Sequence, residues 1–230
     1  MTGYQGVLFD FSGTLFRLEE DPSWFEGFTD AHGAPIEGAA QAELMRRMTA
    51  PMGLPVPMEG EILQAWHGRD LNPDNHRRAF HYVLERSGLA DPVQRAALYG
   101  RVADPDCWAA YPDTAAVLRE LKDAGLKVGV LSNIAYDIRP AFAREGVEHL
   151  VDEFVLSFEV GHMKPDTEVF RIATGALGLP PGRVLMVGDS DEADGASRTI
   201  GCGFALVDPR PVAERPDGLL TAVRAAGALA

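Results

Sequence analysis

Cysteine and long apolar runs are both scarce in this chain of 230 residues. The two cysteines, Cys107 and Cys202, form none of the spacing motifs of metal or redox sites. We expect both to be reduced, buried thiols. No apolar run reaches the roughly 18 residues of a membrane span, and no signal-peptide pattern is visible. These absences favour a cytoplasmic protein that has no membrane partner.

Positive charge is also scarce, and lysine above all. Acidic residues number 34 against 21 basic ones, which gives a formal net charge of −13. Neither nucleic acid nor an anionic membrane would be attracted to such a chain. A phosphorylated small molecule is not excluded, because its binding depends on local charge. The lysines are Lys122, Lys127 and Lys164 alone, so residues 17–108 contain none.

The two parts of the chain differ in hydrophobic pattern. Strands and helices alternate from about Tyr111 onward, and one further strand is expected at residues 7–10. This alternation predicts an α/β fold, a doubly wound parallel sheet of five strands. The other four strands are expected at 127–132, 153–157, 183–187 and 203–207, and helices at 113–124, 136–144, 165–177 and 218–227.

Residues 17–108 show helical spacing and no strand-like run longer than a few residues. Within them, Asn72 starts a clear helix that runs to Gly88. The pattern predicts an all-α domain that is inserted into the α/β core. The core would then comprise residues 1–16 and 109–230.

Four short polar motifs follow strands of the predicted sheet or start its helices. They are residues 10–14, residues 131–133, Lys164 and the acidic loop 187–194. Open α/β sheets place their ligands at the carboxyl ends of their strands. We therefore expect the four motifs to form one site.

Their residue types suit phosphoryl transfer. An aspartate such as Asp10 can attack phosphorus and form an aspartyl-phosphate. Carboxylate and phosphate repel each other, so the site needs cations. Lys164 supplies one charge, and a divalent ion on Asp10 and Asp189 would supply another. Mg²⁺ suits a site with few protein ligands plus phosphate and water.

Each motif also has a simpler explanation. Asp10 could cap a turn, Ser132 could be a helix N-cap, and Lys164 could be a solvated surface charge. For Asp191 and Glu192 we favour such an explanation, since acidic residues are common in the first turn of a helix.

The four ordered motifs resemble those of the haloacid dehalogenase superfamily, in the subclass with a helical cap between the first and second motifs. The resemblance covers residues 1–16 and about 109–230, and it implies a Rossmann-like hydrolase core with residues 17–108 as the cap. It also implies a site between core and cap, closed by cap movement. Its implied metal ligands are the Asp10 and Asp189 carboxylates and the Ser12 carbonyl. The implied catalytic residues are Asp10, Ser12, Ser132, Lys164 and Asp194, and the implied substrate-binding residues are Gly13, Thr14, Ser132, Asn133 and Lys164.

Ser12 departs from the family pattern, whose first motif is commonly Asp-x-Asp-Gly-Thr. In the family's phosphatases, the second aspartate is the general acid and base, a role typically worth ~10²–10⁴-fold in rate. A serine hydroxyl does not titrate near neutral pH. One hypothesis is a phosphatase with weakened acid–base help, which uses a good leaving group or a cap residue such as His67, His76 or His81. Another is a long-lived phosphoenzyme, as the resemblance to the P-type ATPase motif Asp-Lys-Thr-Gly-Thr implies.

We expect a Mg²⁺-dependent phosphatase that acts on a small phosphorylated metabolite. The first alternative is a hydrolase of the 2-haloacid dehalogenase type, which forms an aspartyl ester and needs neither an acid nor a metal. The second is a catalytically impaired protein that binds a phosphorylated ligand. Phosphonoacetaldehyde hydrolases use a cap lysine, which residues 17–108 lack. Nothing in the sequence indicates the oligomeric state.

Overall fold

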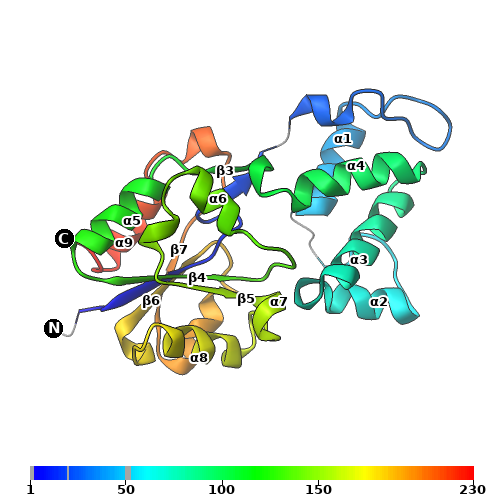
Figure 1. Cartoon of the computed structure of the whole chain (residues 1–230). Coiled ribbons are helices and arrows are strands. Elements are labelled where there is room, and N and C mark those ends of the chain that lie inside the picture. Colours follow the sequence, from blue (N-terminus) through cyan, green and yellow to red (C-terminus); the bar gives the residue numbers. More distant parts are fainter. Residues whose placement is uncertain (1–2, 20, 50–52) are drawn as a thin grey trace. The chain divides into compact units, whose positions relative to one another are not determined.

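A five-stranded parallel sheet carries the polar motifs. The computed structural model describes residues 3–19, 21–49 and 53–230. Its strands lie in the order β5-β4-β1-β6-β7 (Figure 1). The strand bounds are β1 Gly6–Phe9, β4 Lys127–Ser132, β5 Glu153–Leu156, β6 Val184–Gly188 and β7 Gly203–Leu206. The prediction of a five-stranded parallel α/β fold is confirmed.

Strand β1 lies at the centre, where the order of the sheet reverses. It pairs in parallel with β4 on one side and β6 on the other. All four of its residues are buried, as expected for a strand that is covered on both faces. Parallel sheets bind ligands at such a reversal point. The fold therefore places the end of β1 where a site is expected.

Helices cover both faces of the sheet (Figure 1). Helices α5 (Thr114–Asp123) and α9 (Gly218–Ala225) lie on one face, and α8 (Thr167–Ala176) lies on the other. Between α8 and the sheet, the buried core includes Leu8, Phe170 and Met186. The remaining helical segments are α6 Arg139–Arg144, α7 Ser157–Val160, η4 Glu148–Leu150, η5 Pro181–Arg183, η6 Gly195–Ile200 and η7 Val212–Glu214.

Two helices begin later than the sequence predicts. Helix α8 starts at Thr167 and not at Pro165, because the Asp166 side chain accepts a hydrogen bond from the Glu168 amide, at 3.0 Å. Helix α6 starts at Arg139, where the Asp137 side chain accepts from the Arg139 amide. In both places a local aspartate sets the boundary.

Residues 20–107 form a second compact unit, separate from the unit of residues 1–19 and 108–230. The Asn72 side chain accepts hydrogen bonds from two amides at the start of α3, which begins where the sequence predicts. The helices of this unit are α1 Ala39–Thr49, α2 Gly60–His67, α3 Pro73–Arg86 and α4 Pro92–Ala103, with η1 Pro22–Phe25, η2 Arg69–Leu71 and η3 Pro105–Cys107. Residues 20 and 50–52 of the predicted insertion lie outside the described residues.

A short antiparallel pair extends the first unit beyond the predicted core. Strand β2 (Phe16–Leu18) pairs with β3 (Trp108–Ala110). The Phe11 ring lies 5.0 Å from both the Phe16 and the Trp108 rings, measured between centroids. This aromatic packing holds residues 17 and 18 in the first unit, although the sequence places them in the insertion. The role of the second unit as a cap stays a prediction.

Two expectations from the scarce residue types can be compared with the structure. Both cysteines are free; Cys202 is buried as expected, but Cys107 is partly exposed. None of the helices in the described part of the chain has the length and hydropathy that crossing a bilayer demands.

The start of α9 is capped by a side chain that is far away in the sequence, which gives a test of the fold. The Asp113 carboxylate accepts hydrogen bonds from the Leu219 and Leu220 amides, at 2.8 and 3.0 Å. Asp217, at the N-cap position itself, makes no such bond. We predict that Asp113→Ala lowers the free energy of unfolding by about 1–3 kcal/mol, because it leaves two amides unpaired. Asp217→Ala should change it by less than about 0.5 kcal/mol. Equal losses in urea denaturation would contradict this assignment.

Candidate active site

Asp10 stands at the end of the central strand with its backbone held in place. Its amide donates to the Val187 carbonyl at 2.9 Å, which ties it to β6. Its side chain is 9% exposed, and Oδ1 accepts a hydrogen bond from Lys164 Nζ at 2.6 Å. The carboxylate is therefore buried and ion-paired, so it does not merely cap a turn.

The turn after Asp10 is tight. The Phe11 carbonyl accepts from the amides of residues 14–16, and the Gly13 amide donates to Phe16. Gly13 has φ +74°, and a Cβ there would lie 2.4 Å from Asp189 Oδ2. Glycine is required for both reasons. Within the described residues, the amides of Phe11 and Ser12 donate no backbone hydrogen bond.

Lys164 is the buried cation of the site. Nζ donates to Asp10 Oδ1 and Asp194 Oδ1, both at 2.6 Å, and to the Leu131 carbonyl at 3.1 Å. All three ammonium protons thus have acceptors. The side chain is 3% exposed, which rules out the alternative of a solvated surface charge.

Asn133 and Ser132 follow β4 but differ in what they contact. Asn133 accepts from the Lys164 amide at 2.7 Å and donates to the Lys164 carbonyl at 2.8 Å. Its amide group therefore fixes the backbone of Lys164, and the substrate-binding role predicted for it stays a prediction. Ser132 is buried and caps no helix, because the N-cap of α6 is Ile138. Its hydroxyl contacts no polar partner in the described part of the chain.

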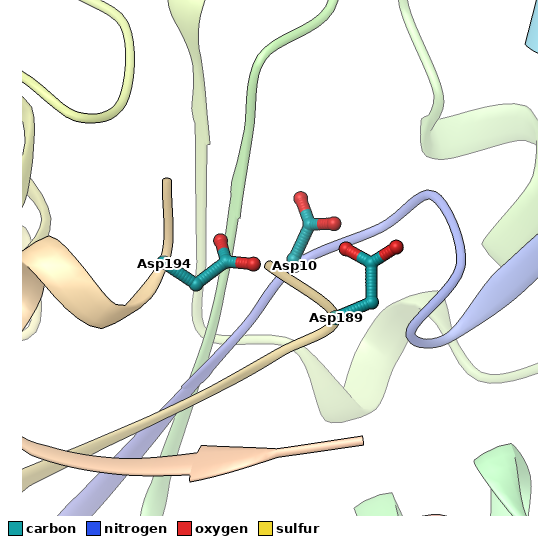
Figure 2. Close-up of side chains that lie close together, drawn as sticks. All are labelled: Asp10, Asp189 and Asp194. Carbon is teal, nitrogen blue, oxygen red and sulfur yellow. The ribbon is translucent and has the colours of Figure 1, made fainter. Parts of the chain in front are cut away.

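The fourth motif adds two carboxylates. Asp194 Oδ2 accepts from the Ser190 amide at 3.0 Å, and Oδ1 contacts Lys164. A Cβ on Gly188 would lie 2.2 Å from Asp194 Cγ, so glycine leaves room for this carboxylate. Asp10, Asp189 and Asp194 each bring a carboxylate oxygen within 4.8 Å of the others, and Figure 2 shows the three groups side by side.

The neighbouring acidic residues lie outside this cluster. Asp191 and Glu192 are exposed, and Asp191 pairs with Arg198 at 2.7 Å. They lie in the turn before η6 and not in the first turn of a helix, so the simpler explanation that we favour for them is wrong about their position.

Burial and mutual repulsion perturb the cluster. Burial, helped by Asp194 and Asp189, raises the pKa of Asp10 to about 7 against the opposing effect of Lys164. Burial and the Asp194 charge raise the pKa of Asp189 to about 6. Burial would lower the pKa of Lys164, but the charges of Asp10 and Asp194 outweigh it and raise that pKa. One ammonium therefore does not offset three carboxylates.

This donor set suits a divalent cation. The carboxylates are hard oxygen ligands, which Mg²⁺ prefers, and their surplus negative charge needs a counter-charge in a buried place. Both oxygens of Asp194 already accept hydrogen bonds, whereas Asp189 has no ion-pair partner among the described residues. Asp10 and Asp189 are thus the carboxylates best placed to hold a cation.

Two further residues matter, one of which the sequence did not indicate. Arg215 is 5% exposed and donates to the carbonyls of Gly13 and Thr14. No motif or spacing marks it in the sequence.

His76, a candidate proton donor, is buried in the second unit and hydrogen-bonded to the Tyr99 hydroxyl at 2.8 Å. Burial lowers the pKa of His76 to about 3, so it is a neutral packing residue at neutral pH.

Comparison with known proteins identifies the family. The family model for haloacid dehalogenase-like hydrolases matches residues 4–197. This chain belongs to that family. The resemblance to this superfamily that the sequence shows is confirmed at the level of the family.

The relatives of this chain include both phosphatases and dehalogenases. A glyceraldehyde 3-phosphate phosphatase of Methanopyrus kandleri is 36% identical over 54% of this chain and 56% of its own, so the chain matches about half of its length. An (S)-2-haloacid dehalogenase of Pseudomonas fluorescens is 28% identical over 90% of this chain and 84% of its own. The solved L-2-haloacid dehalogenase of Xanthobacter autotrophicus shares the fold, with TM-score 0.60, 23% identity and coverage of 95% and 83%.

The raised pKa values give a prediction for stability. Between about pH 4 and the raised pKa values near 6 and 7, the folded protein holds protons that the unfolded chain has lost. The stability of the metal-free protein should therefore fall as pH rises through this window. We predict that Asp189→Asn makes this fall shallower and stabilises the metal-free protein at neutral pH by about 1–3 kcal/mol.

Thermal unfolding with a chelator, from about pH 5 to about pH 7.5, measures this effect. Asp191→Asn is the matched control, because it removes an exposed carboxylate two positions away. If Asp189→Asn did not stabilise the metal-free protein at neutral pH relative to this control, the inferred repulsion between Asp189 and its neighbouring carboxylates would be absent.

Proposed function

We propose that this hydrolase is a Mg²⁺-dependent phosphatase of a small phosphate ester, with Asp10 as the nucleophile. The observation that carries the proposal is the Asp189 carboxylate beside Asp10 and Asp194. A carboxylate that displaces halide from carbon gains nothing from a second, unpaired carboxylate nearby. A carboxylate that attacks a phosphoryl group does, because the second one helps to hold the cation that overcomes the repulsion.

The site residues would divide the reaction as follows. An Asp10 oxygen attacks phosphorus, the bond from phosphorus to the ester oxygen breaks, and the ester oxygen leaves as an anion that takes its proton from water. Water then attacks phosphorus, releases phosphate and restores the carboxylate. Mg²⁺ held by Asp10, Asp189 and the Ser12 carbonyl would supply positive charge to the phosphoryl oxygens. Lys164 adds a fixed charge, which Asp194 orients through a 2.6 Å contact.

Other groups around the turn complete the phosphate site. The amides of Phe11 and Ser12 have no backbone acceptor among the described residues, so they are free to donate to phosphoryl oxygens. The buried Ser132 hydroxyl would donate another hydrogen bond. The Gly13 and Thr14 amides already donate within the turn. The contact of Gly13 and Thr14 with substrate stays a prediction, and we propose the amides of Phe11 and Ser12 as further donors.

Ser12 restricts the substrate. Its hydroxyl does not protonate a leaving alkoxide at neutral pH, as a carboxylic acid would. The leaving group must therefore depart as a stable anion or take its proton from water. We expect fast hydrolysis only for esters whose alcohol has a low pKa.

A dehalogenase reaction is the second candidate. Ser12 favours it, because halide leaves without a proton, and so does the 90% coverage by the Pseudomonas dehalogenase. In this reaction Asp10 would attack carbon, the carbon–halogen bond would break, and water would hydrolyse the resulting ester. The unpaired Asp189 carboxylate counts against this reaction.

Two release assays on the same protein decide between the candidates. We predict Mg²⁺-dependent phosphate release from small phosphate esters, no halide release from 2-haloacids, and no turnover by Asp10→Asn. Metal-independent halide release would establish the dehalogenase instead. If neither product appeared, the chain would be a phospho-ligand-binding protein.

The leaving-group dependence tests the role of Ser12. We predict that Ser12→Asp accelerates hydrolysis of alkyl phosphates about 10²-fold, because it supplies the missing acid. Aryl phosphates, whose phenols leave readily, should gain far less. Ser12→Asn is the control, since it has the same shape as aspartate without the acid. If the aspartate and asparagine variants behaved alike, lack of an acid would not limit the reaction.

A further inference from the structure

Arg215 is a buried arginine that none of the four motifs includes. It follows η7, just before α9, and is 5% exposed. Nη1 donates to the Gly13 carbonyl at 2.8 Å and to the Asp208 carbonyl at 3.2 Å, and Nη2 donates to the Thr14 carbonyl. The guanidinium therefore joins the C-terminal segment to the turn after Asp10.

These two turn carbonyls have no other partner in the turn. The turn is closed by the Phe11 carbonyl and by the bond from the Gly13 amide to Phe16. The Gly13 and Thr14 carbonyls are buried, and buried carbonyls require a donor. Arg215 presents a rigid pair of donors that reaches both at once, which a lysine does not provide.

The surroundings hold the guanidinium in this place. Its central carbon lies 3.1 Å from the centroid of the Tyr111 ring. The Tyr111 hydroxyl is itself bonded to the Arg210 carbonyl at 2.8 Å. On the other side, a Cβ on Gly218 would lie 2.7 Å from Arg215 Cγ and Cδ. Arg215 is thus packed between the Tyr111 ring and the backbone of Gly218.

The position of this turn matters for the reaction. Ser12 lies between Asp10 and the clamped Gly13, and Gly13 itself packs against Asp189, where its missing Cβ would lie 2.4 Å from Oδ2. A turn that shifted by a few tenths of an ångström would move the Ser12 carbonyl and the free amides of Phe11 and Ser12 relative to Asp189.

We propose that Arg215 is a positioning residue, whose contacts with the Gly13 and Thr14 carbonyls set the geometry of the cation and phosphate groups of the turn. This inference rests on the proposed metal-dependent phosphatase function. Arg215 touches neither substrate nor cation. It acts on both through the peptide groups that it orients.

The two possible roles of Arg215, as a nearby charge or as a positioning residue, predict opposite effects of its removal on Mg²⁺ affinity. As a nearby positive charge, Arg215 opposes cation binding, so Arg215→Met would tighten binding if charge were its only role. As a positioning residue, it favours binding, so both Arg215→Lys and Arg215→Met should weaken it. Changes to residues that support metal ligands typically reduce metal affinity 10–100-fold, and we expect a loss of about tenfold from each variant.

Calorimetric titration of the metal-free protein with Mg²⁺ provides the test, with kcat and KM for an aryl phosphate measured in parallel. Arg210→Met is the matched control, because it removes an exposed charge that pairs with Asp208 in the same segment. It should leave Mg²⁺ affinity unchanged within about twofold. Both Arg215 variants should also lower kcat at saturating Mg²⁺.

The outcomes separate this inference from the proposed function. Wild-type protein that neither binds Mg²⁺ nor releases phosphate would overturn both. Wild-type binding with unchanged affinity in Arg215→Lys, or tighter binding in Arg215→Met, would overturn only the role of Arg215. A lower melting temperature with unchanged affinity and kcat would show a purely structural role.

A second variant covers the case in which the Arg215 variants do not fold. Gly218→Ala suits the start of helix α9, because alanine has the higher helix propensity. Its methyl group would press on the Arg215 side chain and displace the guanidinium. We expect weaker Mg²⁺ binding in this folded variant, and unchanged affinity would contradict the proposal.

Discussion

The ion-paired bridge of Lys164 between Asp10 and Asp194 is the interaction on which the site depends. A buried lysine such as Lys164 keeps its charge in such a place only with close anionic partners. The bridge joins residues that are 154 and 30 positions apart in the chain. Asn133 holds the lysine backbone from a third segment. Groups at the carboxyl ends of β1, β4 and β6 thereby converge on Lys164.

The bridge leaves negative charge uncompensated. Lys164 pairs with Asp10 and Asp194, and Asp189 stands beside them without an ion pair among the described residues. Burial intensifies their repulsion, because the low dielectric of the interior screens it poorly. Glycine at positions 13 and 188 permits this crowding, since a Cβ at either position would collide with a carboxylate. The fold thus maintains an arrangement that favours a bound cation.

Local signals in the sequence predicted the sheet and the motifs. The apolar runs that end at Asp10, Ser132 and Gly188 mark β1, β4 and β6. Long-range contacts were beyond sequence reasoning. The strands β2 and β3 have three residues each and pair across some ninety positions, too short for a periodic signal. Likewise, Arg215 contacts a turn 201 positions away, and the bonds of Asn133 to Lys164 leave no trace in local sequence.

Titration of the metal-free protein with Mg²⁺ as a function of pH tests the central claim most directly. The account predicts saturable binding at about pH 7.5 that weakens steadily toward about pH 5, because protons compete with the cation for Asp10 and Asp189. Absence of binding at the higher pH would contradict the claim that the surplus charge serves a cation. Affinity that did not change with pH would contradict the assignment of these two carboxylates as its ligands.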